Sequence, residues 1–182
     1  MKRPLWLAVF AVIVVLVVGM MLIGPCRPCC TESRRSVSVT KLYHVFLAVG
    51  KWRQAHDGNY PPNLRALFDA GYIDEATLVD PADKTPPMRD GIKCSYEYVG
   101  LVPTNIPAET IIAYNRKDIF KDGRNVLSND GAVFWQSEEH VADPKGLEHP
   151  SLPASYKAVV KAYGKDLTDE INARLKKFYE IE

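Results

Sequence analysis

An apolar run near the amino terminus dominates the hydrophobic pattern of the chain. Between Leu5 and Ile23, only Gly19 falls outside the apolar residue types. A helix of this length rises roughly 28 Å, close to the hydrocarbon thickness of a bilayer. Because lipid offers no hydrogen-bond partners, the backbone must be paired within the segment, which favours a helix even where Val and Ile are abundant. The run therefore predicts a transmembrane helix over residues 5–23, within an anchor segment of residues 1–30.

Two kinds of processing are alternatives to a retained anchor. A cleaved signal peptide has a shorter apolar region followed by a small-x-small site, and Gly24-Pro25-Cys26 offers no such site. Lipidation of Cys26 would require small residues just before it, where Pro25 stands. We favour the retained anchor over both alternatives. Because the flank before the run is too short to hold a domain, we expect a signal anchor with the bulk of the chain exported.

The chain from Thr31 to His56 has the hydrophobic period of an amphipathic helix. Pro25 and Pro28 predict a break between this helix and the anchor, because proline disrupts a helix interior. We expect an apolar stripe along the helix to hold it against a sheet, with Phe46 and Trp52 as its large structural side chains. The stripe consists of Leu42, Val45, Phe46, Val49 and Trp52.

After Gly91 the hydrophobic period changes to two, which is typical of strands. Residues 94–98 and 110–114 are predicted strands on this pattern. Asp130-Gly131 is typical of a two-residue type I′ hairpin turn, in which Gly131 takes a positive φ. Elements in this order predict an α+β domain over residues 31–140, with one long helix packed on one face of a small antiparallel sheet.

The composition changes again beyond Val141. Pro144, Gly146 and Pro150 indicate a linker, and apolar residues at helical spacing follow near the carboxyl end. We therefore expect residues 141–182 to form a linker and a C-terminal helical extension.

Charge and composition narrow the function by exclusion. The chain has 23 Lys and Arg against 22 Asp and Glu, a formal net charge of +1. This balance does not favour a nucleic-acid partner, which requires a basic surface. The sequence also lacks a nucleophile elbow, a phosphate-binding glycine loop and a zinc-binding pair of histidines. We therefore predict that the protein is not an enzyme and needs no cofactor.

Three cysteines follow the anchor in the order Cys-x-x-Cys-Cys, namely Cys26, Cys29 and Cys30. One interpretation is a redox pair or a set of metal ligands. No second pair of Cys or His at ligand spacing accompanies them. We favour juxtamembrane cysteines that are lipidated, joined in a disulfide or without a chemical role.

Acidic residues in the predicted turns are candidates for calcium ligands, because Ca²⁺ binds carboxylate oxygens. These candidates are Asp118, Asp122 and Asp130. Their spacing does not match an EF-hand loop, and Asp-Gly turns explain two of them without a metal. Solvated turns are the interpretation that we favour.

Several segments together resemble one family of proteins. The stretch KLYHVFLAVGKWRQAHDGNYPPNLRALFDAGYI, which begins at Lys41, is similar to the helix and following loop of bacterial type II secretion pseudopilins and other pilin-like proteins. The segments CSYEYVG, ETIIAYN and DGRNVLSNDGAVFW resemble, in this order, the C-terminal sheet of the same family. The resemblance covers residues 37–137, and the chain has no recognisable prepilin peptidase site.

The resemblance implies a structural or interaction role in a type II secretion or pilus-like assembly. The expected partners are the lipid bilayer and other pilin-like or secretion-apparatus proteins. The chain would be a single-pass protein of the inner membrane with its domain on the periplasmic side. One alternative is an anchored binding module with a pilin-like fold that does not polymerise. A thiol or metal enzyme that uses Cys26, Cys29 and Cys30 is a further alternative.

Overall fold

The structure, a computed structural model, describes residues 27–100, 102–137 and 151–181 of the 182-residue chain. The expected span over residues 5–23 and Cys26 lie outside these residues. Among the helices that the structure describes, none has the length and apolar character needed to cross a membrane. The chain divides into two compact units, residues 1–33 and 34–182. The second unit holds the sheet, the groove and the pocket described below.

The first described helix, α2, runs from Arg27 to Ala55. It begins earlier than expected, and Pro28 lies in its first turn rather than in a break. Proline is tolerated there because the first N–H groups of a helix have no partner within it. Cys29 and Cys30 are therefore in helical backbone, and the expected helix break at Pro28 is wrong.

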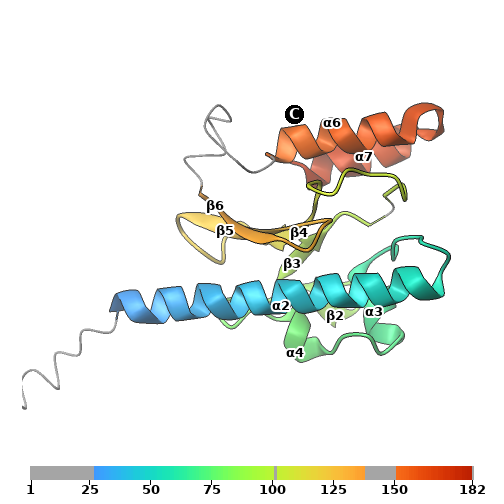
Figure 1. The fold of residues 1–182 in the computed structure, drawn as a ribbon. Helices are drawn as coiled ribbons and strands as arrows, with labels where there is room; N and C mark the ends of the chain where they lie inside the picture. The colour runs from blue at the N-terminus through green and yellow to red at the C-terminus, as the bar shows by residue number, and fades with distance from the viewer. Residues whose placement is uncertain (1–26, 101, 138–150, 182) are drawn as a thin grey trace, which may run out of the picture. The chain divides into compact units, whose positions relative to one another are not determined.

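The expected α+β class with a small antiparallel sheet is confirmed (Figure 1). The sheet has four strands in chain order: β3 (Tyr96–Tyr98), β4 (Ile111–Asn115), β5 (Gly123–Ser128) and β6 (Val133–Ser137). A separate hairpin pairs β1 (Met88–Arg89) with β2 (Ile92–Lys93). The remaining elements are α3 (Leu64–Asp69), α4 (Glu75–Leu78), α6 (Leu152–Tyr163), the 3₁₀ turn η2 (Gly164–Asp166) and α7 (Asp169–Phe178).

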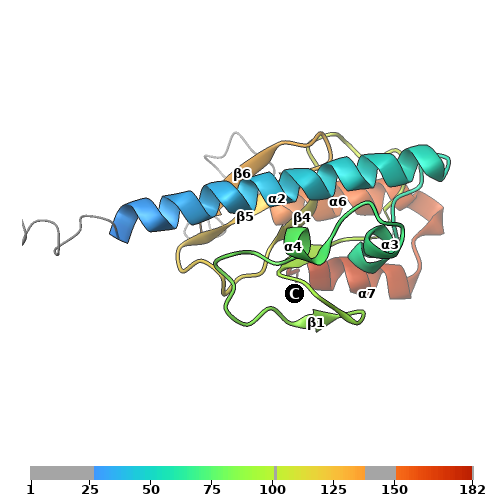
Figure 2. The ribbon, with the colours of Figure 1, turned by 90° about the horizontal axis from the view of Figure 1, so that it is seen from below.

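Helices cover both faces of the sheet, where the sequence predicts a cover on one face. Every residue of β4 and β5 is buried. Residues 34–55 of α2 lie on one side of the strands and α6 and α7 on the other (Figures 1 and 2). The cause is visible in β4, because Ile111-Ile112-Ala113-Tyr114 has no polar position, a pattern typical of strands buried on both faces.

The C-terminal helices are bonded directly to β4. The Ile111 N–H donates to Ser155 Oγ of α6 at 3.1 Å, and the Tyr179 hydroxyl donates to Ile111 O at 2.9 Å. The Tyr114 hydroxyl donates to Phe178 O. These side-chain bonds complete the backbone pairing of Ile111, beside which the register of β4 against β5 is irregular. The helices expected as an extension are thus part of the core of the domain.

The turn at Asp130-Gly131 differs from the expected type I′ form. Gly131 has φ 89°, but Asp130 is not among the described non-glycine residues with positive φ, as a type I′ turn requires. Gly131 N–H donates to Ser128 O at 3.0 Å, and Ser128 N–H donates to Ala132 O at 2.9 Å. The loop is therefore a three-residue connection, stabilised by the Asp130 carboxylate, which accepts from Ala132 N–H and from the Ser128 hydroxyl.

A two-residue hairpin turn lies instead at Asp90-Gly91, between β1 and β2. Both residues have positive φ, 49° and 81°, as a type I′ turn needs. This turn and the following chain also correct the strand expected over residues 94–98. Cys94 N–H donates to Pro87 O and Ser95 N–H to Leu78 O, so that β2 and β3 are separate strands.

Candidate functional site

The outer face of α2 carries large apolar side chains that the domain does not bury. Tyr43 and Leu47, about one turn apart, have 46% and 43% of their surface exposed, whereas Val37, 42% exposed, lies about 80–120° around the helix from them. The opposite face supplies the core. Of the predicted stripe, Leu42, Val45 and Val49 are buried, whereas Phe46 and Trp52 are partly buried and pack against the core.

A groove continues this outer face toward α3 and α4. It has a volume of about 560 Å³ and is lined by Leu47 and Ala48 of α2 and by Phe68, Tyr72 and Ile73. The groove is also lined by His44, by the positively charged Lys51 and by the negatively charged Asp74. The outer face and the groove together form a surface on one side of α2 in which apolar side chains lie beside Lys51 and Asp74.

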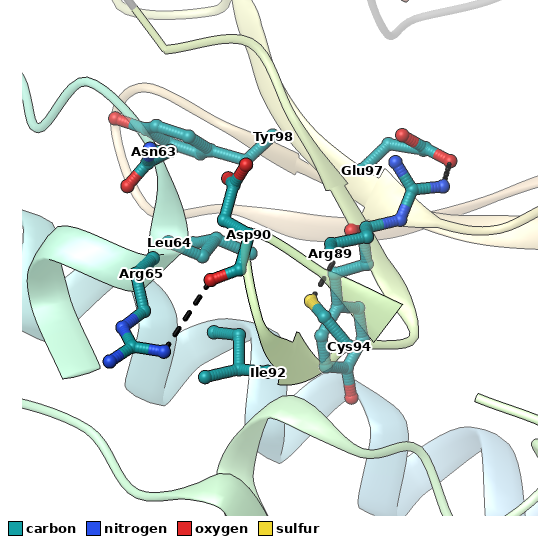
Figure 3. A pocket seen from close by; sticks show the side chains of 10 residues that line it. Asn63, Leu64, Arg65, Arg89, Asp90, Ile92, Cys94, Glu97 and Tyr98 are labelled. Atoms are coloured by element: carbon teal, nitrogen blue, oxygen red, sulfur yellow. Dashed lines mark hydrogen bonds and ion pairs between the residues drawn. The ribbon is translucent and has the colours of Figure 1, made fainter. Parts of the chain in front are cut away.

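A second candidate is a pocket of about 240 Å³ formed by α3, the β1–β2 hairpin and β3 (Figure 3). Asn63 holds the first turn of α3 in place, because its Oδ1 accepts from Ala66 N–H at 2.9 Å. The type I′ turn fixes the hairpin on the other side. The lining residues are Asn63, Leu64, Arg65, Arg89, Asp90, Ile92, Cys94, Tyr96, Glu97 and Tyr98.

The arginines of the pocket already have carboxylate partners. Arg65 Nε donates to Asp69 Oδ1 at 2.7 Å, and Arg89 pairs with Glu97. The Arg65 Nη1 atom lies 3.4 Å from the carbonyl oxygen of Asp90. Within the part of the chain that the structure describes, the Asp90 carboxylate makes no ion pair within 4.0 Å, but after Asp69 it contributes to the attraction that raises the pKa of Arg65. Figure 3 shows it pointing to the side of Asn63 and Tyr98, away from the Arg65 guanidinium.

The thiol of Cys94 lines this pocket but is not suited to nucleophilic chemistry. It is buried, and it donates to Tyr96 O at 3.4 Å. Burial raises the pKa of the Cys94 thiol to about 11, so the thiol is protonated near neutral pH. Cys94 therefore contributes an apolar wall rather than a reactive group.

A buried polar network connects α2 to the sheet and was not foreseen from the sequence. Ser38 Oγ donates to Asn115 Oδ1 at 3.0 Å, and Asn115 Nδ2 donates to Asp80 Oδ2 at 2.9 Å. Asp80 is 0% exposed, and its other oxygen accepts from Ala82 N–H at 2.8 Å. Because the network is satisfied and does not line the pocket, we assign it a structural role.

The calcium candidates do not form one site. Asp122 and Asp130 flank β5, roughly 25 Å apart at the rise of a strand, too far to bind a single ion. An ion pair with Arg35 lowers the pKa of Asp122, and a hydrogen bond from Ser128 lowers that of Asp130. Asp118 is exposed. The residues that the structure describes contain no group of three potential metal ligands.

The other predicted site residues are the cysteines near the anchor. Cys29 and Cys30 lie in the first turn of α2, within the unit of residues 1–33.

The pocket combines residues 63–65 with residues 89–98, and no local periodicity in the sequence indicates that these two segments meet. The Asp90-Gly91 dipeptide is a turn signal in the sequence that would have located its hairpin.

Comparisons with protein-family models, curated proteins and solved structures found no match to this chain.

Proposed function

We propose that this protein is a membrane-anchored structural or interaction subunit with a pilin-like domain, related to a type II secretion or pilus-like assembly. Residues 5–23 anchor it in the bacterial inner membrane, and the domain lies on the periplasmic side. The observation that carries the proposal is the pair of exposed apolar side chains Tyr43 and Leu47, which lie about one turn apart on the outer face of α2.

The outer face has no role in the core of its own domain. α2 buries its inner face with Leu42, Val45 and Val49, which already holds it to the rest of the domain. Exposed apolar side chains that gather on one helix face are typical of interaction surfaces. The adjoining groove has the form that receives an apolar helix face from a partner. We infer that the occupant is the long helix of a neighbouring pilin-like subunit.

Site-specific photo-crosslinking in native membranes tests this contact. A photoreactive residue replaces Tyr43 or Leu47 in the full-length protein, and the matched control replaces the exposed Lys157 of α6. We expect adducts from α2 whose cross-linked peptides belong to the long helix of a second copy or of another pilin-like protein. Equal adducts from Lys157, or none from α2, would contradict the proposal.

The anchor is tested separately, on protein extracted from membranes. Intact mass and amino-terminal sequencing should find residues 5–23 in the mature chain. A mature start between residues 25 and 32 would instead show processing and would remove the anchor from the proposal.

The pocket at α3 and the β1–β2 hairpin supports a second candidate function, an anchored binding module that does not polymerise. The pocket is concave, and the apolar side chains Leu64 and Ile92 line it together with the charged Arg65, Arg89, Asp90 and Glu97, so it offers both apolar and polar contacts to a small ligand. In that case variants of Tyr43 and Leu47 retain the cellular role, whereas variants of the pocket lose it.

A further inference from the structure

We propose that the pocket between α3 and the β1–β2 hairpin binds a short, uncharged segment of a partner protein, which adds its extended backbone to the free edge of β3. The proposal names a ligand class for the second candidate function and rests on that function. It does not depend on the contact proposed for α2, because neither Tyr43 nor Leu47 lines this pocket.

β3 is an edge strand, because the strands of the sheet follow the order β3-β4-β5-β6. Across the ladder to β4, Val99 N–H donates to Ile112 O at 3.0 Å. In an antiparallel ladder, the backbone groups of alternate residues point to the partner strand, and those of the residues between them point away. The N–H and C=O groups of Tyr96 and Tyr98 therefore face the outer edge of the sheet.

The outward backbone groups of β3 lack strong partners. Among the described residues, none bonds to the N–H or the C=O of Tyr98. The C=O of Tyr96 accepts from the Cys94 thiol at 3.4 Å, and a thiol is a weak donor. Such an edge can receive a further strand, because its unpaired groups repeat at the strand period.

The pocket lies along this edge rather than on a face of the sheet. All three residues of β3 line it, whereas its described lining includes no residue of β4, α2, α6 or α7. α3 and the hairpin close the pocket to a volume of about 240 Å³. This space is too small for an edge strand that belongs to a folded sheet, so the occupant is a flexible loop or terminus.

The charges of the pocket compensate one another, which favours an uncharged occupant. Arg89 pairs with Glu97. Arg65 bonds to Asp69 and is also attracted by Asp90. A further charge of either sign would lose hydration without gaining a free partner. Peptide N–H and C=O groups form hydrogen bonds without bringing a net charge.

An apolar surface lies beside the edge. Leu64 and Ile92 are buried, line the pocket and lie between α3 and the hairpin (Figure 3). Successive side chains of an extended segment point to opposite sides. A segment paired with Tyr98 can therefore place one apolar side chain against Leu64 and Ile92.

Backbone recognition is tested with the blocked peptide Ac-Thr-Val-Thr-Val-Thr-NH2, by calorimetric titration of the full-length protein in detergent. One analogue is N-methylated on its Val amides, and the other on its Thr amides. Because a strand turns alternate N–H groups to its neighbour, we expect one analogue to bind like the parent peptide and the other about tenfold more weakly. Equal affinity of all three peptides, or an equal loss in both analogues, would overturn the proposal.

Amide hydrogen exchange locates the bound peptide. The N–H of Tyr98 should exchange rapidly in the free protein and slowly with the parent peptide bound, because it then donates to the peptide. An unchanged rate at Tyr98 would overturn the proposal. Slow exchange without peptide that depends on protein concentration would overturn it too, by identifying a second copy of the chain as the occupant.

Matched variants test the apolar surface. Ile92 and Ile106 are each 7% exposed, and of the two Ile92 lines the pocket. We expect Ile92→Ala to weaken binding of the parent peptide about fivefold or more, and Ile106→Ala to leave it unchanged. Leu47→Ala should also leave it unchanged, so that a failure of the α2 contact is distinguishable from a failure of this site. An unaltered affinity in Ile92→Ala would overturn the proposal.

Discussion

The ring of Phe46 lies against Gly131, so closely that a side chain at Gly131 would overlap it. A Cβ placed there would stand 2.6 Å from Cε1 and 2.8 Å from Cζ of the ring. Gly131 also has φ 89°, which disfavours any residue with a Cβ. The contact joins α2 to the turn between β5 and β6. This close approach of helix and turn requires a residue without a Cβ at position 131.

Gly131→Ala should therefore destabilise the protein in two ways. Positive φ contributes backbone strain of about 1–3 kcal/mol, and displacement of the Phe46 ring adds a further packing cost. Gly71→Ala is the matched control, because Gly71 has φ 70° but no atom within 4 Å of the added Cβ. Thermal unfolding of the full-length protein in detergent should show a larger loss of stability for Gly131→Ala.

The larger loss of stability in Gly131→Ala than in Gly71→Ala should disappear when the Phe46 ring is removed. In a Phe46→Ala background, Gly131→Ala should cost about as much as Gly71→Ala, which a double-mutant cycle measures. An excess that persists without the ring would show that the contact is not its cause.

Local periodicity explains which parts of this fold could be predicted. The stripe at Leu42, Val45 and Val49 recurs at helical spacing and is buried as expected. Tyr96 lies in a strand, as the local pattern predicts. Alternating apolar and polar residues are typical of a strand that buries one face. Features of this kind depend on near neighbours in the chain.

Features that depend on distant segments could not be predicted in the same way. Ile111 pairs with Ser155 and Tyr179, which are 44 and 68 residues away. Asp80 is buried by bonding to Asn115, and its position before a proline in the sequence is typical of an exposed turn. The candidate pocket belongs to the same class, because α3 and the β1–β2 hairpin meet only in the folded chain.

The hydrogen bond from the Tyr179 hydroxyl to Ile111 O of β4 tests whether the C-terminal helices contribute to the stability of the domain. Tyr179→Phe removes the donor to Ile111 O while keeping the buried ring. We expect a loss of about 1 kcal/mol in the free energy of unfolding, the usual net value of a buried hydrogen bond. Tyr72→Phe is the control, since its hydroxyl makes no hydrogen bond within the described residues. Equal effects of the two changes would contradict an integral role for the bond.

Acid should weaken the ion pair between Arg124 and Glu180. Arg124 is 1% exposed and donates to both carboxylate oxygens, at 2.8 and 3.0 Å. The hydrogen bond from Arg124 lowers the pKa of Glu180 from its ordinary 4.5. The pair therefore stabilises the fold fully above that value, and this contribution is lost as the pH falls through the lower pKa of the folded state.

Glu180→Gln should remove this pH dependence. At neutral pH we expect a loss of about 1–3 kcal/mol, because the charge-assisted hydrogen bonds from the buried Arg124 guanidinium to the Glu180 carboxylate are lost. As the pH falls below 4.5 the difference in stability from the original protein should narrow, because protonation of Glu180 progressively removes the carboxylate from the original protein as well. Thermal unfolding across this range measures both effects, with the exposed Glu109→Gln as control. A difference that is constant with pH would show that the charge of Glu180 is not its source.

The cysteines near the anchor should be dispensable for folding, which separates a structural role from a thiol enzyme. Replacing Cys26, Cys29 and Cys30 by Ser leaves Cys94 as the remaining thiol. Because burial raises the pKa of Cys94 to about 11, roughly a thousandth of it is thiolate at pH 8, and alkylation of the folded protein should be slow until denaturant is added. The same variant should complement a deletion strain, since the contact proposed for Tyr43 and Leu47 needs no thiol. Loss of function with the fold preserved would instead make the three juxtamembrane cysteines the active feature of the protein.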